Sequence, residues 1–99
     1  MAVAIQFEFR GTTIDKYDEL NECTGFLPGG PMPTGGLFHW VTKTDDGFLT
    51  VDVWESREVF EQFFNKRVLP RYQDVGITDP PEVQFFEVHN YLSGTGWRG

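Results

Sequence analysis

The chain has 99 residues, the length of one domain, and a formal net charge of -7. Its few Lys and Arg residues form no cluster, which argues against nucleic acid as a partner, because binding to phosphates needs concentrated positive charge. One cysteine excludes an intramolecular disulfide, and no apolar run approaches the roughly 18 residues that span a membrane. We therefore expect a cytoplasmic protein with no membrane partner, made of one domain at residues 1–92 and a flexible Gly-rich tail at 93–99.

Aromatic residues make up 16% of the chain, including ten Phe and three Trp. This is more bulk than a small monomeric core readily encloses. The composition therefore predicts a second buried surface, which is either a dimer interface or an apolar pocket.

The first predicted strand covers residues 2–9, where apolar and more polar residues alternate. A helix is expected next, with Thr12 or Thr13 as its cap and Thr12 and Asp15 at capping-box spacing. Ile14, Tyr17 and Leu20 give this helix an inward stripe, and Tyr17 is interpreted as a core residue.

Residues 24–36 contain five Gly and three Pro among thirteen positions, which predicts a loop. Phe26, Leu27 and Met32 make this loop more apolar than a plain linker. Two interpretations stay open: the loop folds over something apolar, or its few apolar residues plug the end of the core.

The next two strands, residues 37–43 and 48–54, are expected to form an antiparallel hairpin. The turn contains Asp46-Gly47, a pair that supplies the left-handed conformations of a tight turn. Alternation in the second strand of the pair predicts that its aliphatic residues face the helices. These residues are Leu49, Val51 and Val53, and they alternate with Thr50, Asp52 and Trp54.

A second helix follows, with Ser56 as its N-cap and phenylalanines at helical spacing. It should end or kink near Leu69, because Pro70 lacks an amide hydrogen, and one further turn is expected before Gly76. The last predicted strand covers residues 82–92.

The element order βαββαβ predicts an α+β ferredoxin-like sandwich: a four-stranded antiparallel sheet of order 4-1-3-2, with both helices on one face. The opposite face is expected to mix rings with ionisable groups. Its expected members are Gln6, Glu8, His39, Thr50, Asp52, Trp54, Phe85, Glu87, His89 and Tyr91, whereas Trp40 is expected to pack under a helix. Such a face suits two sheets that pack across a homodimer and enclose a cavity.

The stretches VDVWESREVFEQFF, DDGF and VQFFEVHNYL resemble the dimeric α/β-barrel superfamily, in particular small proteins related to antibiotic biosynthesis monooxygenase (ABM) domains. The resemblance implies a homodimer with outer helices and a ligand-sized space by the sheet. It also implies a range of activities: cofactor-independent oxygenases, haem-degrading enzymes, polyketide cyclases and proteins without a known reaction. Two family features are missing, since Phe63 or Phe64 stands where many ABM-type sequences have His, and residues 2–9 lack the Asn of the haem-degrading members.

His39, Asp52 and His89 are the candidate catalytic residues, because they are expected on one sheet face and a histidine beside a carboxylate is a workable general base. Proton removal from a phenol or an activated C–H group suits a cofactor-independent monooxygenase or a cyclase. The candidate substrate-binding residues are Gln6, Trp54, Phe85 and Tyr91.

Two alternatives stay open. The histidines could simply satisfy hydrogen bonds in the filled centre of a non-catalytic, dimeric binding or stress-related protein. Alternatively, a metal could recruit His39, His89, Asp52 and Glu87 or Glu8, although no metal-binding spacing supports this set. The leading hypothesis is a homodimer that binds an aromatic or polyketide-like small molecule and needs neither cofactor nor metal.

Overall fold

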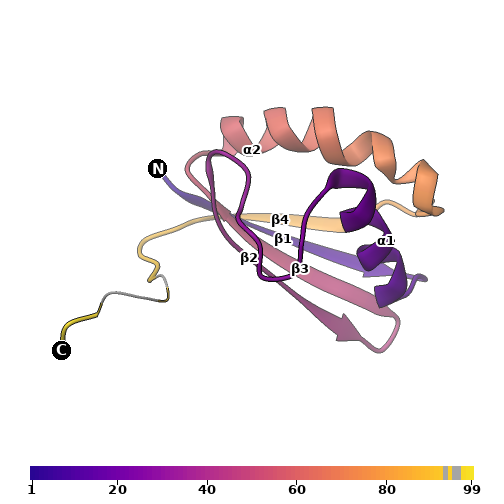
Figure 1. The fold of residues 1–99 in the computed structure, drawn as a ribbon, viewed down its shortest axis with the longest axis horizontal. Coiled ribbons are helices and arrows are strands. Elements are labelled where there is room, and N and C mark those ends of the chain that lie inside the picture. The colour runs from indigo at the N-terminus through magenta and orange to yellow at the C-terminus, as the bar shows by residue number, and fades with distance from the viewer. Residues whose placement is uncertain (93, 95–96) are drawn as a thin grey trace.

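The computed structural model describes residues 1–92, 94 and 97–99, and it has the predicted βαββαβ order (Figure 1). The predicted tail at 93–99 includes residues 93, 95 and 96, which lie outside the described residues. The elements are β1 (Val3–Arg10), α1 (Ile14–Thr24), β2 (Gly36–Thr44), β3 (Gly47–Trp54), α2 (Arg57–Phe63) and β4 (Glu82–Glu87). A π-helical turn (Phe64–Val68) and two 3-10 turns (Leu69–Arg71 and Gln73–Val75) continue α2.

The sheet has the order β2-β3-β1-β4, and its neighbouring strands are antiparallel. This is the predicted order 4-1-3-2, read from the other edge. Figure 1 shows the strands as one layer with α2 and its continuation above them. Side chains of α1 and α2 pack against the same sheet face, since Tyr17 contacts His39 and Phe60 contacts Phe7. The ferredoxin-like fold is therefore confirmed.

One of the two predicted N-terminal helix caps is confirmed. Ser56 caps α2, and its hydroxyl accepts a hydrogen bond from the Val59 amide at 3.2 Å. Thr13 is the first residue before α1, but its side chain makes no cap hydrogen bond, so the predicted capping interaction is not formed. The helical segment after Pro70 ends at Gly76, which has a φ of 78°. This end agrees with the predicted extra turn.

The hairpin between β2 and β3 is confirmed, with Thr44 opposite Gly47. The predicted left-handed conformations are not needed, because among the described residues every positive φ belongs to a glycine other than Gly47. Gly47 is required for a different reason. A Cβ atom there would overlap the carbonyl oxygen of Phe9 on the neighbouring strand. A glycine at this position thus allows the backbone of β3 to approach that of β1 closely, and it is not needed for an unusual dihedral angle in the turn.

The predicted facing of β3 is wrong. Asp52 lies opposite Ile5 in the β1–β3 register and Thr50 lies opposite Phe7, and directly paired residues point to the same side of a sheet. Ile5 and Phe7 are buried beneath the helices, so Thr50, Asp52 and Trp54 also face the helices.

The aliphatic residues of β3 consequently face the opposite, helix-free side of the sheet. These residues are Leu49, Val51 and Val53. The physical reason lies in side-chain size. Phe48 and Trp54 are the bulkiest side chains of β3, and they are 0% and 2% exposed in the core. Burying these two rings removes more apolar surface from water than burying the aliphatic set would.

Strand β4 is shorter than predicted, and it ends at Glu87 rather than at residue 92. Glu87 pairs with Val3, and the Val88 amide donates a hydrogen bond to the Ala2 carbonyl at 3.1 Å. Beyond this point β1 has no residues left to pair with, so the ladder stops. His89 and Tyr91 therefore lie after the strand instead of on a sheet face. Phe85, opposite Ile5, faces the helices, which also corrects its expected placement.

The helix-free face of the sheet carries a patch of exposed aromatic side chains. Phe38, Trp40 and Phe86 are 46%, 43% and 49% exposed. Trp40 lies opposite Val51, so the expectation that it packs under a helix is wrong. We call this patch, together with the partly buried Val51 beside it, the open-face patch.

No helix among the described residues has the length and apolar character needed to cross a membrane.

Candidate active site

A cavity of about 870 Å³ lies between the sheet and its helices. The lining is mainly apolar and rich in aromatic residues, and it draws on all the elements except β4, together with the loop at residues 24–36. Among the lining rings are Phe7, Phe9, Phe48, Trp54, Phe60, Phe64 and Tyr72. The cavity thus belongs to one chain, on the helix side of the sheet, and the expectation of a space on the opposite face is wrong.

The loop at residues 24–36 forms one wall of this cavity. Phe26, Leu27 and Met32 line it, together with the prolines between them. The ring of Phe26 packs against Phe63, with centroids 5.8 Å apart. Of the two interpretations of this loop, the structure supports folding over an apolar space.

Three polar side chains in this cavity form one hydrogen-bonded chain. Asp52 on β3 lies directly opposite His39 on β2, and the Asp52 Oδ1 atom is hydrogen bonded to His39 Nδ1. On the other side of the imidazole, Tyr17 Oη from α1 lies 2.6 Å from His39 Nε2. We call Asp52, His39 and Tyr17 the polar triad. All three residues line the cavity.

The neighbouring tryptophan fixes the carboxylate of the polar triad. Trp54 Nε1 donates to Asp52 Oδ2 at 3.2 Å, so each carboxylate oxygen has a partner. The Asp52 side chain is 15% exposed and that of His39 is 29% exposed. This combination of burial and saturated hydrogen bonding holds the imidazole in one orientation.

One arrangement of protons lets His39 act as a base, and it requires an ionised Asp52 and a neutral imidazole. An ionised Asp52 only accepts hydrogen bonds, so His39 Nδ1 carries hydrogen and donates to it. The Nε2 atom of the neutral ring is then an acceptor, and the Tyr17 hydroxyl donates to it. Besides its contact with Asn21, Tyr17 Oη keeps acceptor capacity for a proton or a hydrogen bond from a ligand. The polar triad can therefore move a proton from the cavity to the imidazole.

Burial raises the pKa of the Tyr17 hydroxyl. A hydrogen bond with Asn21 lowers this pKa in part, and the negative charges of Asp52 and Asp18 raise it further. Tyr17 therefore keeps its proton at neutral pH. This agrees with its role as a hydrogen-bond donor to His39.

The structure separates the predicted site residues into two groups. His39, Asp52 and Trp54 come together in the cavity. His89 is exposed in the bend after β4, and Tyr91 is also exposed. Both lie outside the cavity lining.

The other two predicted substrate-binding residues also lie outside the cavity lining. Gln6 lies on the helix-free face, opposite Val51 and Gln84. Phe85 packs in the core next to Phe60, and the guanidinium carbon of Arg57 lies 3.8 Å from its ring centroid.

Tyr17 is the site residue that sequence reasoning missed. Its position in the inward stripe of the first helix indicated only that it would be covered by other residues. A tyrosine that faces the interior beside a strand histidine was the available signal, because a buried phenol needs a hydrogen-bond partner.

The metal alternative gains no geometric support. Among the described residues, no group of three His, Cys, Asp or Glu side chains is placed to hold a metal ion. Glu8 lies opposite Leu49 on the helix-free face, whereas Asp52 faces the helices. The sheet thus separates Glu8 from Asp52, whereas Glu87, opposite Val3, lies on the helix side but is exposed.

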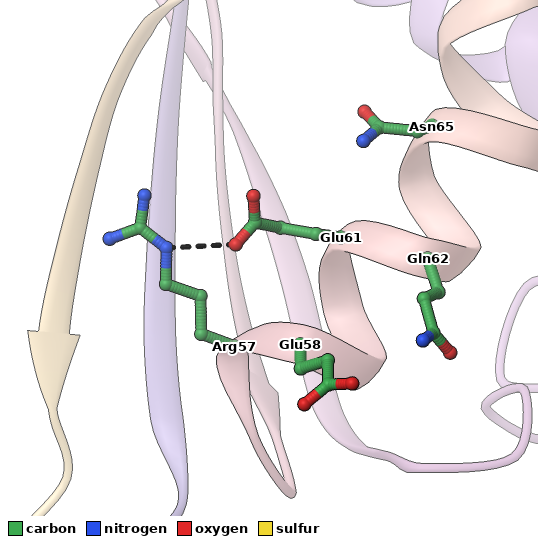
Figure 2. Close-up of a pocket in the computed structure, with 5 residues that line it drawn as sticks. All are labelled: Arg57, Glu58, Glu61, Gln62 and Asn65. Atoms are coloured by element: carbon green, nitrogen blue, oxygen red, sulfur yellow. Dashed lines mark hydrogen bonds and ion pairs between the residues drawn. The ribbon is translucent and has the colours of Figure 1, made fainter.

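A second hollow lies on the outer side of α2 (Figure 2). Its lining is polar, from Arg57, Glu58, Glu61, Gln62 and Asn65. Arg57 Nε donates to Glu61 Oε1 at 2.9 Å across one helical turn, as the dashed line in Figure 2 shows. Both side chains are largely exposed, and such a surface pair adds little stability. This open hollow is a poorer candidate for chemistry than the cavity around the polar triad.

The buried tyrosines predict a loss of stability at alkaline pH. Burial, followed by the charge of Asp52, raises the pKa of Tyr72 well above its ordinary value. The folded chain then keeps a proton that the unfolded chain loses above about pH 10, so the free energy of unfolding should fall as pH rises beyond that value. One such group contributes a slope of up to about 1.4 kcal/mol per pH unit.

Denaturant unfolding between pH 8 and pH 11 measures this slope, with both pH limits chosen to bracket the ordinary tyrosine pKa of about 10. Tyr72→Phe removes the buried phenol and should make the slope shallower. An identical slope in the parent and in Tyr72→Phe would contradict the assignment.

The fold and cavity together define a small ferredoxin-like α+β protein with an aromatic cavity between sheet and helices. Solved structures with the same fold include SnoaB, a cofactor-independent oxygenase from Streptomyces nogalater. It superposes with a TM-score of 0.60 at 14% identity, over 94% of this chain and 97% of that one.

A candidate antibiotic biosynthesis monooxygenase from Deinococcus radiodurans is also similar. Its TM-score is 0.59 at 12% identity, over 97% of this chain and all of that chain (100%). No protein-family model and no curated protein sequence matches the chain. The resemblance to ABM-type proteins is thus confirmed in the fold that they share.

Proposed function

We propose that this chain binds an aromatic or polyketide-like small molecule in its cavity and catalyses cofactor-independent monooxygenation there. The observation that carries this proposal is the polar triad, a hydrogen-bonded Asp-His-Tyr chain within an otherwise aromatic cavity. The description of SnoaB as a cofactor-independent oxygenase supports the choice of reaction.

The proposed chemistry begins with proton removal from a methylene group between two aromatic rings that are conjugated with a carbonyl, as in an anthrone. Tyr17 accepts that proton while its own proton passes to His39 Nε2, and Asp52 stabilises the imidazolium that results. The substrate carbanion then reduces dioxygen, and a carbon–oxygen bond forms to give a peroxide anion. This anion takes the proton back from the His39 imidazolium through Tyr17 and becomes a hydroperoxide. Loss of water from the hydroperoxide leaves a carbonyl, so that one methylene and one dioxygen yield one ketone and one water.

The surrounding rings have a separate role in this proposal. A planar ligand can pack against their faces, and each aromatic contact contributes about 0.5–1.5 kcal/mol beyond simple burial. Such packing orients the ligand and excludes water from the carbanion. Trp54 both holds Asp52 and forms part of this wall.

The proposal includes a homodimer formed through the open-face patch. Three half-exposed aromatic side chains on one flat sheet face are costly to leave in water, at about 25 cal/mol per Å² of apolar surface. A second copy presents the same patch, so the two can pack face to face with their helices outside. In this arrangement each chain keeps its own cavity.

Two other functions use the same site. A cyclase or lyase would need the same proton transfer without dioxygen, and a non-catalytic binding protein would need only the aromatic walls. The polar triad favours an enzyme, because a hydrogen-bonded general base has no evident use in passive binding of an apolar ligand.

Dithranol, a 1,8-dihydroxyanthrone, is a suitable probe because its methylene lies between two rings opposite a carbonyl. We expect uptake of one dioxygen per anthrone and formation of the anthraquinone, well above the rate in buffer. Methylene exchange in deuterium oxide without dioxygen uptake would favour the cyclase, and binding without exchange would favour the binding protein. Neither binding nor turnover would contradict the proposal.

A further inference from the structure

We infer that the cavity selects uncharged ligands, that is, neutral phenols or aryl ketones, and discriminates against those with a carboxylate or phosphate. This inference rests on the proposed function, since it names the substrate class of the same cavity. It is carried by the distribution of charged side chains around the cavity.

Positive charge is absent from the cavity lining. The chain has eight Lys and Arg residues, all within the described residues, and none of them lines the cavity. Several are held at the surface by carboxylates, as in the pairs of Arg10 with Glu82 and of Lys16 with Glu19. An anionic ligand would therefore lose its hydration without gaining an ion pair.

Negative charge is present instead. The carboxylates of Asp18 and Asp52 both belong to the lining. The C-terminal part of α1 also borders the cavity through Leu20 and Asn21, and its last turn has no basic residue. The carbonyl end of a helix carries a partial negative charge, so α1 adds to the same field.

The pKa values of the two cavity tyrosines are raised by the same negative charges. After burial, the charge of Asp52 raises the pKa of both Tyr17 and Tyr72, and Asp18 adds to the effect at Tyr17. Forming a phenolate there is disfavoured by the same charges that an anionic ligand would meet. A neutral ligand avoids this cost, and it can still hydrogen bond to Tyr17 Oη.

The test compares two anthraquinones of nearly equal size, aloe-emodin and rhein. Both are 1,8-dihydroxyanthraquinones, but aloe-emodin has a hydroxymethyl group where rhein has a carboxylate. Quenching of Trp fluorescence near neutral pH measures binding, because Trp54 lies in the cavity wall. We expect aloe-emodin to bind at least about tenfold more tightly than rhein.

Asp18→Asn should narrow this ratio, because it removes a negative charge from the lining while Asp52 stays in place. Asp45→Asn is the matched control, since it makes the same chemical change in the exposed hairpin turn, outside the cavity lining, and it should leave the ratio unchanged. Equal or tighter binding of rhein would overturn the inference and leave the proposed function standing. Failure of both compounds to bind would overturn the proposed function and the inference with it.

Discussion

Asp52→Asn is expected to lower kcat for anthrone oxidation by about 10²- to 10⁴-fold, the usual range for losing a positioned general base. The amide has no negative charge to stabilise positive charge on the ring, and with its oxygen toward Trp54 it turns an NH2 group toward the Nδ1–H of His39. It can still accept a hydrogen bond from Trp54 Nε1, so the cavity wall should survive. Binding of aloe-emodin should therefore change little, whereas turnover falls.

The matched control is Asp45→Asn, which makes the same chemical change in the exposed hairpin turn. It should leave both binding and turnover intact.

A second comparison concerns the two histidines. His39→Ala should lose turnover, whereas His89→Ala should keep it, because His89 is exposed and lies outside the cavity. An Asp52→Asn variant that turns over like the parent would contradict a catalytic role for the polar triad.

Trp40→Glu is expected to convert the proposed dimer to a folded monomer at micromolar concentration. Burying an unpaired carboxylate in an apolar interface costs several kcal/mol, enough to shift the dissociation constant by several powers of ten. Because Trp40 is 43% exposed within one chain, the substitution should leave the fold intact. Light scattering coupled to gel filtration measures the mass, and circular dichroism checks the fold.

Gln73→Glu serves as the control for added charge, because it places the same carboxylate on the exposed side of the segment after α2. This variant should stay dimeric. If the parent protein were already monomeric at this concentration, the open-face patch would not be a homodimer interface, but the cavity and the polar triad of each chain would be unaffected.

Strand β1 shows why the fold could be predicted from the sequence. Its apolar residues alternate strictly with less apolar ones, so one face was defined without reference to any partner. In β3 both sets contain bulky apolar side chains, and local alternation does not decide which set is inside. The decision depends on the pairing of Ile5 with Asp52, a contact between residues far apart in the chain.

The candidate site was predictable to a similar extent. His39 and Asp52 were expected on one face of the sheet, and they do share one, because the hairpin turn fixes which residues of its two strands lie opposite each other. The face is the helix side rather than the opposite one. His89 was placed with them because the strand was extended to residue 92, whereas the ladder ends where β1 begins. Tyr17 joins the site through the packing of α1 over β2, which the sequence of the helix alone does not specify.

The alternation along β3 places different constraints on substitutions at even- and odd-numbered positions. Thr50 and Asp52 touch the cavity, whereas Val51 and Val53 touch only the helix-free side. Substitutions at the even-numbered positions can therefore change the proposed substrate preference without affecting the proposed dimer interface. Substitutions at the odd-numbered positions can change the interface without affecting the cavity. An insertion or deletion of one residue within β3 would exchange the two sets, and it would abolish both properties in a single step.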